Sequence, residues 1–460
     1  MSALGISAVC REEHPRPPPA VELGHQLRRT IALALPISLA RAGLVVMLTV
    51  DTILAGQAGE QELAFFGISM SPVLIMYTVG AGLLVGALVL TAQAHGAGRL
   101  ADCGHVWRLS LAVAGGLGLA YATVLSGGER LLTLLGQEDA IVRGGGRVLG
   151  MWAWGLPGVM LYVATASFLE GIGRPRAAVA VSLAANLLNL LLGSALVFGY
   201  GSLPAMGAVG AALATSITLW VMLVLLAAYA LMLPDRRALG IFLPVAGRYR
   251  MIGRMLLLGL PVALSVGFET AAFSGSAVIA GWLGPTALAA FQLVNNVTAL
   301  FYVLSLGIAT AAAIRVGNAI GRGDRRGVSS AGWSAAVLVA VVMLAAGLAI
   351  GLGRGAIAAA YTSDPVVIAA ALPALGLLST LVLLDGVQSA LMGALRGAGD
   401  VMLPTAVYGV VFGGVAIPLN IYLGYGQGGG AGGLILGLSA GLALAALALA
   451  LRFAAIARPR

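Results

Sequence analysis

The chain has 460 residues, of which 60% are hydrophobic and only 9% are Asp, Glu, Lys or Arg, against roughly 25% charged residues in an ordinary soluble domain. This composition excludes a water-soluble enzyme. The formal net charge of +9 comes from arginine, because the sequence contains no lysine, and the two cysteines, Cys10 and Cys103, support neither a disulfide framework nor a zinc site.

The amino-terminal segment, residues 1–29, is rich in proline, arginine and glutamate and has no long apolar run. It predicts a disordered cytoplasmic tail rather than a signal peptide. The remainder contains twelve apolar segments, each long enough to span a bilayer, for which a helix needs about 20 apolar residues. In chain order, the predicted helices are 30–56, 66–93, 106–126, 148–170, 177–199, 205–233, 253–282, 286–314, 329–352, 366–394, 402–424 and 430–455.

Arginine placement predicts the orientation of these helices. Loops rich in arginine stay on the cytoplasmic side of a membrane. With the amino terminus inside, all but five of the 26 arginines fall in the inner segments. Four of the exceptions, Arg130, Arg143, Arg147 and Arg354, fall in outer loops, and Arg41 falls within a predicted helix. We therefore expect an integral protein of the plasma (inner) membrane with both termini in the cytoplasm.

An internal repeat divides the chain into two halves. Shifting the sequence by 225 positions aligns the first part of each half without gaps, and farther along the offset slips by a few residues, so that Leu169–Gly171 aligns with Leu395–Gly397. The matched pairs include Pro36 with Pro261, Phe66 with Phe291 and Tyr77 with Tyr302. Because each half has six helices, both enter the membrane from the same side, as in transporters built from parallel repeats. The predicted fold is an all-α polytopic membrane protein with twelve transmembrane helices in two pseudo-symmetric six-helix lobes.

The predicted domains follow from this division. They are a tail at 1–29, an N-terminal lobe at 30–233, a cytoplasmic inter-lobe linker at 234–252, a C-terminal lobe at 253–455 and a cytoplasmic tail at 456–460.

Three carboxylates lie well inside predicted helices: Asp51, Glu269 and Asp385. An ionisable group in hydrocarbon costs several kcal/mol, so each is a functional candidate. Gln292 and Asn296 lie four positions apart on one face of the eighth predicted helix. If the seventh, eighth and tenth helices meet, these side chains join Glu269 and Asp385 in an oxygen-rich cluster.

Two kinds of cation suit such a cluster. Oxygen ligands favour a hard ion such as Na⁺. The two carboxyl groups could instead share or exchange a proton, because like charges repel each other in a low dielectric. The residues alone do not decide between Na⁺ and H⁺. Asn189, in the fifth predicted helix, is a further polar candidate, although membrane asparagines also join helices by hydrogen bonds.

Several stretches resemble one transporter family, the multidrug and toxic compound extrusion (MATE) family, and in particular its NorM-like branch. The similar stretches, which span residues 28 to about 440, include Val50–Gly56, Gln93–Gly98, Phe168–Pro175, Gly207–Thr215, Gly259–Glu269, Leu384–Gln388 and Leu395–Asp400. Gly193 and Leu381 depart from the family pattern, since relatives have a second asparagine at the first position and some have tyrosine at the second.

The resemblance implies export of amphiphilic, often cationic, small compounds by antiport with Na⁺ or H⁺, with no other cofactor or metal and no nucleic acid. It implies cation-binding roles for Glu269 and Asp385, with Gln292 and Asn296 as polar neighbours and Asp51 as a coupling residue. It marks Asn189 as an N-lobe polar position, whereas Arg41 is unexpected in this family and is a candidate substrate contact. We expect a monomer in membrane lipid.

Three other functions are compatible with duplicated lobes. A flippase for lipid-linked saccharides would have a more cationic lumen than this chain, which has only Arg41 within a predicted helix. A polytopic membrane enzyme would need carboxylate or histidine clusters at a membrane face. A channel would need a continuous pore between the lobes.

Overall fold

The computed structural model describes residues 19–200, 204–244, 247 and 249–458. In that part of the chain every regular element is helical. The elements are α1 (Pro19–Ala58), α2 (Glu60–Gly96), α3 (Leu100–Ser126), α4 (Gly128–Leu134), α5 (Asp139–Gly171), α6 (Arg176–Phe198), α7 (Gly207–Leu231), α8 (Arg250–Trp282), α9 (Pro285–Gly321), α10 (Arg325–Tyr361), α11 (Pro365–Ala398), α12 (Met402–Tyr408), η1 (Gly409–Ala416), α13 (Ile417–Asn420), η2 (Ile421–Gly426) and α14 (Gly430–Ala457).

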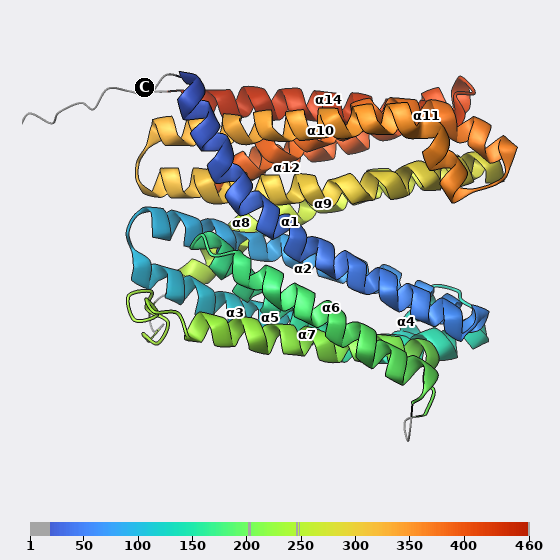
Figure 1. Cartoon of the computed structure of the whole chain (residues 1–460), viewed down its shortest axis with the longest axis horizontal. Coiled ribbons are helices and arrows are strands. Elements are labelled where there is room, and N and C mark those ends of the chain that lie inside the picture. The colour runs from blue at the N-terminus through green and yellow to red at the C-terminus, as the bar shows by residue number, and fades with distance from the viewer. Residues whose placement is uncertain (1–18, 201–203, 245–246, 248, 459–460) are drawn as a thin grey trace, which may run out of the picture.

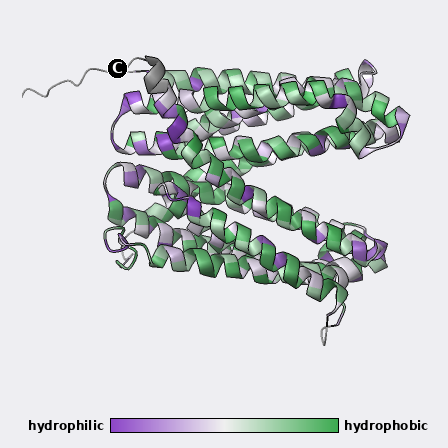
Figure 2. Ribbon diagram, in the orientation of Figure 1, coloured by the Kyte–Doolittle hydropathy of each residue, from purple (hydrophilic) through white to green (hydrophobic). Residues whose placement is uncertain are grey.

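Twelve helical segments of the described chain are long and apolar enough to cross a membrane. This confirms the predicted all-helical, twelve-span fold. The eleventh span combines α12, η1, α13 and η2 into one segment that contains π-helical turns around Pro418. Apolar residues cover the middle of the helices in Figure 2, and polar residues gather mainly at their ends. This banding fits a bilayer that surrounds the middle of the bundle.

The helices form two lobes, α1–α7 and α8–α14, which lie side by side (Figure 1). We call the end where α1 begins and α14 finishes the terminal end, and the opposite end the distal end. The ribbons of the two lobes approach each other at the terminal end and diverge toward the distal end (Figure 1). The predicted pair of six-helix lobes is therefore confirmed.

Polar contacts join the lobes near the terminal end. Gln93 of α2 donates a hydrogen bond to the carbonyl of Gly397 in α11, over 3.0 Å. His95 of α2 contacts the amide oxygen of Asn318 in α9, over 3.4 Å. Gln93 and Asn318 occupy equivalent positions of the repeat, since they are 225 residues apart. Each lobe thus contacts the other through the side chain at the same position of its second long helix.

Close helix packing accompanies these polar contacts. A side chain at Gly86 of α2 would overlap the carbonyl oxygen of Met255 in α8. Gly259 of α8 likewise faces the carbonyl oxygen of Leu83 in α2. Small residues permit this close approach of backbones, which supplies much of the association energy between membrane helices.

Helix α1, part of the N-terminal lobe, contacts both lobes. Its first turns are held by Arg315 of α9, which donates to the carbonyl of Gln26 over 3.1 Å and also contacts Thr30. Farther along, α1 is bound to α6 of the N-terminal lobe, where Ser182 donates to the carbonyl of Ala40 over 3.2 Å. In Figure 1, α1 begins beside the C-terminal lobe and crosses to the N-terminal lobe.

Several predicted boundaries differ from the observed ones, because helices continue past the apolar runs that define them in the sequence. The first helix begins at Pro19, so part of the predicted tail at 1–29 is helical, and residues 1–18 lie outside the described residues. The loop between the predicted helices 106–126 and 148–170 contains α4 and the start of α5. The predicted linker at 234–252 overlaps α8, which begins at Arg250. The predicted tail at 456–460 overlaps the end of α14 at Ala457.

Candidate functional site

A pair of carboxyl groups lies at mid-helix depth in the C-terminal lobe. Glu269 of α8 and Asp385 of α11 are within hydrogen-bonding reach of each other. Asp385 is 4% exposed, and Glu269 is half-buried. Two ionised carboxylates only accept hydrogen bonds, so the contact requires a proton or a cation between them. One oxygen of Asp385, Oδ1, is buried without a protein partner in the described structure.

Aromatic hydroxyls and an amide surround this pair. Gln388 of α11 donates to the hydroxyl of Tyr408 in α12, and the amide oxygen of Gln388 is buried without a partner. The negative charge of Glu269 acts on both Tyr302 and Tyr408. The acid pair therefore lies among polar groups, and two of its buried acceptors, Asp385 Oδ1 and Gln388 Oε1, suit a cation or a proton.

Arg396 is a positive charge that interacts electrostatically with Glu269. It lies in the last turn of α11, with its Nε atom buried and without a partner. The sequence analysis assigned Arg396 to an inner loop, and the helix extends past that expectation. Within the described residues, no ion pair joins Arg396 to either carboxyl group, so it influences the acid pair without neutralising it by direct contact.

A separate polar site lies in the N-terminal lobe around Asp51 of α1. Asn189 of α6 donates to Asp51 over 3.2 Å and to the hydroxyl of Thr215 in α7 over 2.8 Å. Thr215 in turn donates to the other oxygen of Asp51. Asp51 and Asn189 are fully buried. The structure thus brings together two of the predicted residues with a third, Thr215, that the sequence analysis did not single out.

Arg41 of α1 forms an ion pair with Glu170 of α5, with 3.8 Å between Nη2 and Oε2. The sequence analysis gave Arg41 no partner, and Glu170 stood at the last position of the predicted helix 148–170. In the structure α5 continues to Gly171, so the Glu170 side chain points back into the bundle, as helical side chains do toward the helix amino terminus. Tyr77 and Tyr162 lie close enough to Arg41 and Glu170 to interact with them electrostatically.

Gln292 and Asn296 lie in a different place from the acid pair. They line a cavity of about 400 Å³ near the distal end of the C-terminal lobe, together with Tyr361 and Asp364. Tyr361 donates to the amide oxygen of Asn296 over 2.9 Å. Within the described structure neither Glu269 nor Asp385 lines this cavity, so the four residues expected to form one oxygen-rich cluster do not share it.

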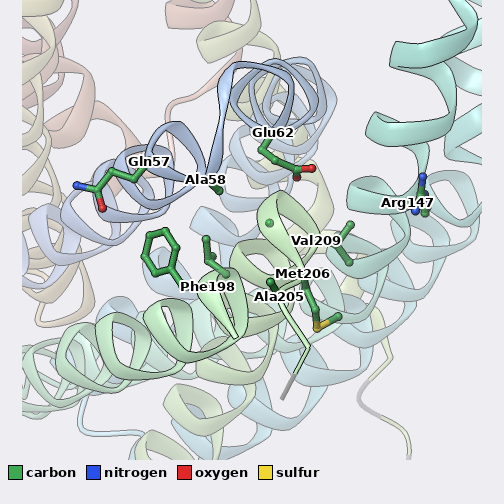
Figure 3. Close-up of a pocket in the computed structure, with 10 residues that line it drawn as sticks. Gln57, Ala58, Glu62, Arg147, Phe198, Ala205, Met206 and Val209 are labelled. Atoms are coloured by element: carbon green, nitrogen blue, oxygen red, sulfur yellow. The ribbon is translucent and has the colours of Figure 1, made fainter. Parts of the chain in front are cut away.

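A cavity of about 620 Å³ lies at the distal end of the N-terminal lobe (Figure 3). Glu62 and Arg147 line it among apolar side chains that include Phe198 and Met206. Glu62 accepts a hydrogen bond from the backbone N–H of Ala208, over 2.6 Å. This bond satisfies the first turn of α7 and gives Glu62 a structural role at that helix terminus.

Comparison with known protein families explains the duplicated architecture. A family model described as MatE matches the chain twice, over residues 36–195 and 261–422. The starts of the two matches differ by 225 positions, which is the offset of the internal repeat. The chain belongs to the MatE family. It is therefore a membrane transporter and not an enzyme.

Related proteins agree with this MatE assignment over nearly the whole chain. The "Probable multidrug resistance protein NorM" of Caulobacter vibrioides is 35% identical over 413 residues, which cover 89% of this chain and 87% of that protein. The protein of the same name from Bradyrhizobium diazoefficiens is 32% identical and covers 97% of this chain and 98% of its own length. The predicted NorM-like resemblance is confirmed.

A solved MatE structure also shares the fold. The eukaryotic MATE transporter AtDTX14 superimposes with a TM-score of 0.85, covering 95% of this chain and 98% of its own, at 20% sequence identity. At that identity the likeness establishes the fold alone, and the roles of individual side chains must be argued from this chain.

Three residues of the MatE sites were missed by the sequence analysis. Glu170 stood at the last position of the predicted helix 148–170, Arg396 was placed in an inner segment two residues beyond the predicted helix 366–394, and neither was singled out as a site residue. Thr215 was quoted only as the last residue of a family-like stretch, since a hydroxyl in an apolar helix gives no hydropathy signal. The repeat did contain a usable signal, because Leu169–Gly171 aligns with Leu395–Gly397 and thereby pairs Glu170 with Arg396.

Proposed function

We propose that this MatE protein is a secondary active exporter of small amphiphilic or cationic compounds, including drugs, and that it couples export to the inward flow of Na⁺ or H⁺. The observation that carries the proposal is the contact between Glu269 and Asp385 in the interior of the C-terminal lobe, with no ion-paired partner among the described residues. Such a pair takes up one cation when it faces one side of the membrane and releases it when it faces the other. Relatives named as multidrug resistance proteins support the choice of substrate class.

The proposed cycle uses the two lobes as moving bodies. A cation from outside occupies the acid pair and favours release of the exported compound outward, and the emptied protein then resets. Movement of one charge through 100 mV supplies about 2.3 kcal/mol, to which the ion gradient adds. The predicted inner-membrane location with cytoplasmic termini makes the distal end the outer end, so the ion enters from the end at which the lobes diverge.

The remaining candidate residues take supporting roles in this proposal. Asp51, held by Asn189 and Thr215, is a second buried carboxylate that responds to cations in the N-terminal lobe. Gln292 and Asn296 supply oxygen ligands near the distal end, on the route of the ion to the acid pair. The transporter acts as a monomer in lipid and needs no cofactor besides the coupling ion.

Reconstitution tests the proposal directly. Purified protein in liposomes is given a fluorescent lipophilic cation as substrate, with Na⁺ and H⁺ gradients imposed separately. We expect one gradient, or both, to drive transport by the wild type, and Glu269→Gln and Asp385→Asn to lose at least about tenfold of this gradient-dependent rate, equivalent to ~1.4 kcal/mol in the barrier.

A matched control is Glu138→Gln, which removes an exposed carboxylate at the start of α5 that makes no capping hydrogen bond. Its transport should match that of the wild type. Full ion-dependent transport by both acid-pair variants, at normal protein levels in the liposomes, would contradict the proposal.

A further inference from the structure

Two hydrogen-bonded contacts join α8 to the eleventh span, one on each side of Glu269. On the side of the terminal end, the hydroxyl groups of Thr405 in α12 and Ser265 in α8 lie 2.9 Å apart. On the side of the distal end, the amide of Asn420 in α13 donates to the hydroxyl of Ser276 in α8 over 2.6 Å. Ser265, Ser276 and Asn420 are at most 1% exposed, so water does not compete for these bonds.

The two contacts lie on the same face of α8 as the acid. Glu269 follows Ser265 by four positions and precedes Ser276 by seven, spacings that place the three side chains in line on one helix face. Between the contacts, Gly409 of η1 packs against α8, because a side chain there would lie 3.3 Å from the ring of Phe268. The part of α8 that carries Glu269 is therefore held against the eleventh span along its length.

A third contact joins the eleventh span to the helix that carries the other acid. Gln388 of α11 donates to the hydroxyl of Tyr408 in α12, which is 2% exposed. Gln388 lies three positions after Asp385, hence on the same face of α11. Tyr408 likewise lies three positions after Thr405. One span thus binds the helix of Glu269 and the helix of Asp385 through neighbouring side chains.

The π-helical turns bring these contacts into register. Thr405 and Asn420 are fifteen positions apart, whereas their partners Ser265 and Ser276 are eleven positions apart. As α-helices these lengths would measure about 22 Å and about 16 Å, a mismatch of roughly one helical turn. The π-helix η1 lies between the two contacts and takes up the extra turn, because its hydrogen bonds join residues five positions apart instead of four.

We propose that the eleventh span sets the separation of Glu269 and Asp385, with Thr405, Tyr408 and Asn420 as positioning residues. The proposal rests on the proposed function, because it explains how the coupling site is held in shape. The three contacts keep the two carboxyl groups close enough to share one cation. When a contact is lost, the π-turns rewind toward α geometry, and the mismatch of about 6 Å allows the two acids to move apart.

The pH profile of the melting temperature in detergent, with no ion gradient, tests the proposal apart from transport. Repulsion between two ionised carboxylates varies inversely with their distance, so an increase from about 3 Å to about 6 Å halves it. We expect Ser276→Ala and Thr405→Val to lower the melting temperature at every pH and to reduce its fall from about pH 6 to about pH 9 by about half. The other ionisable groups that interact with Glu269 are unchanged in both variants; they are Arg396, Tyr302 and Tyr408.

Matched controls separate a positioning role from the general stabilisation that hydrogen bonds between membrane helices provide. Ser182→Ala removes a buried serine that joins α6 to α1 in the other lobe, and it should lower the melting temperature without changing the pH profile. Thr405→Ser keeps the hydroxyl and should follow the wild type. An alkaline fall as steep in Ser276→Ala and Thr405→Val as in the wild type overturns the proposal, and so does an equal reduction in Ser182→Ala or Thr405→Ser.

Transport separates this proposal from the proposed function. In the liposome assay, Ser276→Ala should raise the ion concentration for half-maximal transport at least about threefold and retain the maximal rate. An unchanged ion dependence in this variant overturns the positioning role. A wild-type profile with no alkaline fall overturns the acid pair and the positioning role together. Absence of ion-driven transport in the wild type, with the expected pH profiles, would instead count against antiport alone.

Discussion

Asn189 of α6 donates a hydrogen bond to the carboxylate of Asp51 in α1, over 3.2 Å. The same amide group donates to Thr215 of α7, whose hydroxyl also donates to Asp51. Three helices of the N-terminal lobe are thus joined through one buried carboxylate. Because Asp51 accepts hydrogen bonds and has no ion-paired partner in the described structure, its stability in the bundle depends on these two donors.

Loss of one donor should destabilise this network. Thr215→Val keeps the shape of the side chain but leaves one oxygen of Asp51 without its bond, at a cost of about 1–3 kcal/mol. Thr218→Val is the matched control, since Thr218 is also buried in α7 but donates only to the carbonyl of Ala214 in its own helix. We expect it to cost less than about 1 kcal/mol. Thermal unfolding measures both, and equal losses would argue against a special role for the Asp51 bond.

The acid pair should make stability depend on pH. In alkaline solution, where both Glu269 and Asp385 are ionised, the two like charges repel each other in a low dielectric. The melting temperature of the wild type should therefore fall as the pH rises, and that of Glu269→Gln should fall less. Glu138→Gln, at an exposed site, should follow the wild type. Parallel pH profiles for Glu269→Gln and the wild type would show that the two groups do not titrate against each other.

Close packing between the lobes predicts the effect of added volume. Gly86→Ala places a methyl group against the carbonyl of Met255 in α8, and overpacking of this kind costs about 1–3 kcal/mol. Gly116→Ala in α3 is the control, because a Cβ there meets no atom within 4 Å. That change should be neutral or slightly stabilising. Thermal unfolding compares the two variants, and a stability of Gly86→Ala equal to that of Gly116→Ala would contradict the close approach of α2 and α8.

The distal cavity of the C-terminal lobe should affect ion entry more than ion coupling. Asn296→Ala removes the oxygen that accepts from Tyr361, so we expect the ion concentration for half-maximal transport to rise by about threefold, ~0.7 kcal/mol, with the maximal rate retained. Leu300→Ala, at an exposed position of the same helix, should change neither value. Loss of all gradient-dependent transport in Asn296→Ala would place Asn296 with the acid pair instead.

The fold was predictable because bilayer thickness imposes one length on every span. Apolar runs located all twelve helices, and the repeat located the two lobes. The ends of the helices were less predictable, since a helix keeps its hydrogen bonds beyond the point at which its side chains stop being apolar. Pro19 illustrates this at the start of α1, eleven residues before the predicted residue 30.

The candidate sites were predictable only where a charge interrupts an apolar run. Asp51, Glu269 and Asp385 stood out for that reason, and the structure brings the last two together. Glu170 and Arg396 sit near helix ends, where charges are expected, and only the three-dimensional direction of their side chains reveals that they face the interior. Gln292 and Asn296 share a helix face, but helical spacing does not specify which neighbouring helix that face meets.

Glu170 and Arg396 occupy equivalent positions of the two repeats but carry opposite charges. An ancestral dimer of two identical half-length chains would have had the same charge on both sides of its twofold axis. In a single chain the two equivalent positions vary independently, so one lobe carries Glu170 with Arg41 as its ion-paired partner and the other carries Arg396. A chain made from two copies of either lobe would therefore keep the architecture but carry the same residue at both positions.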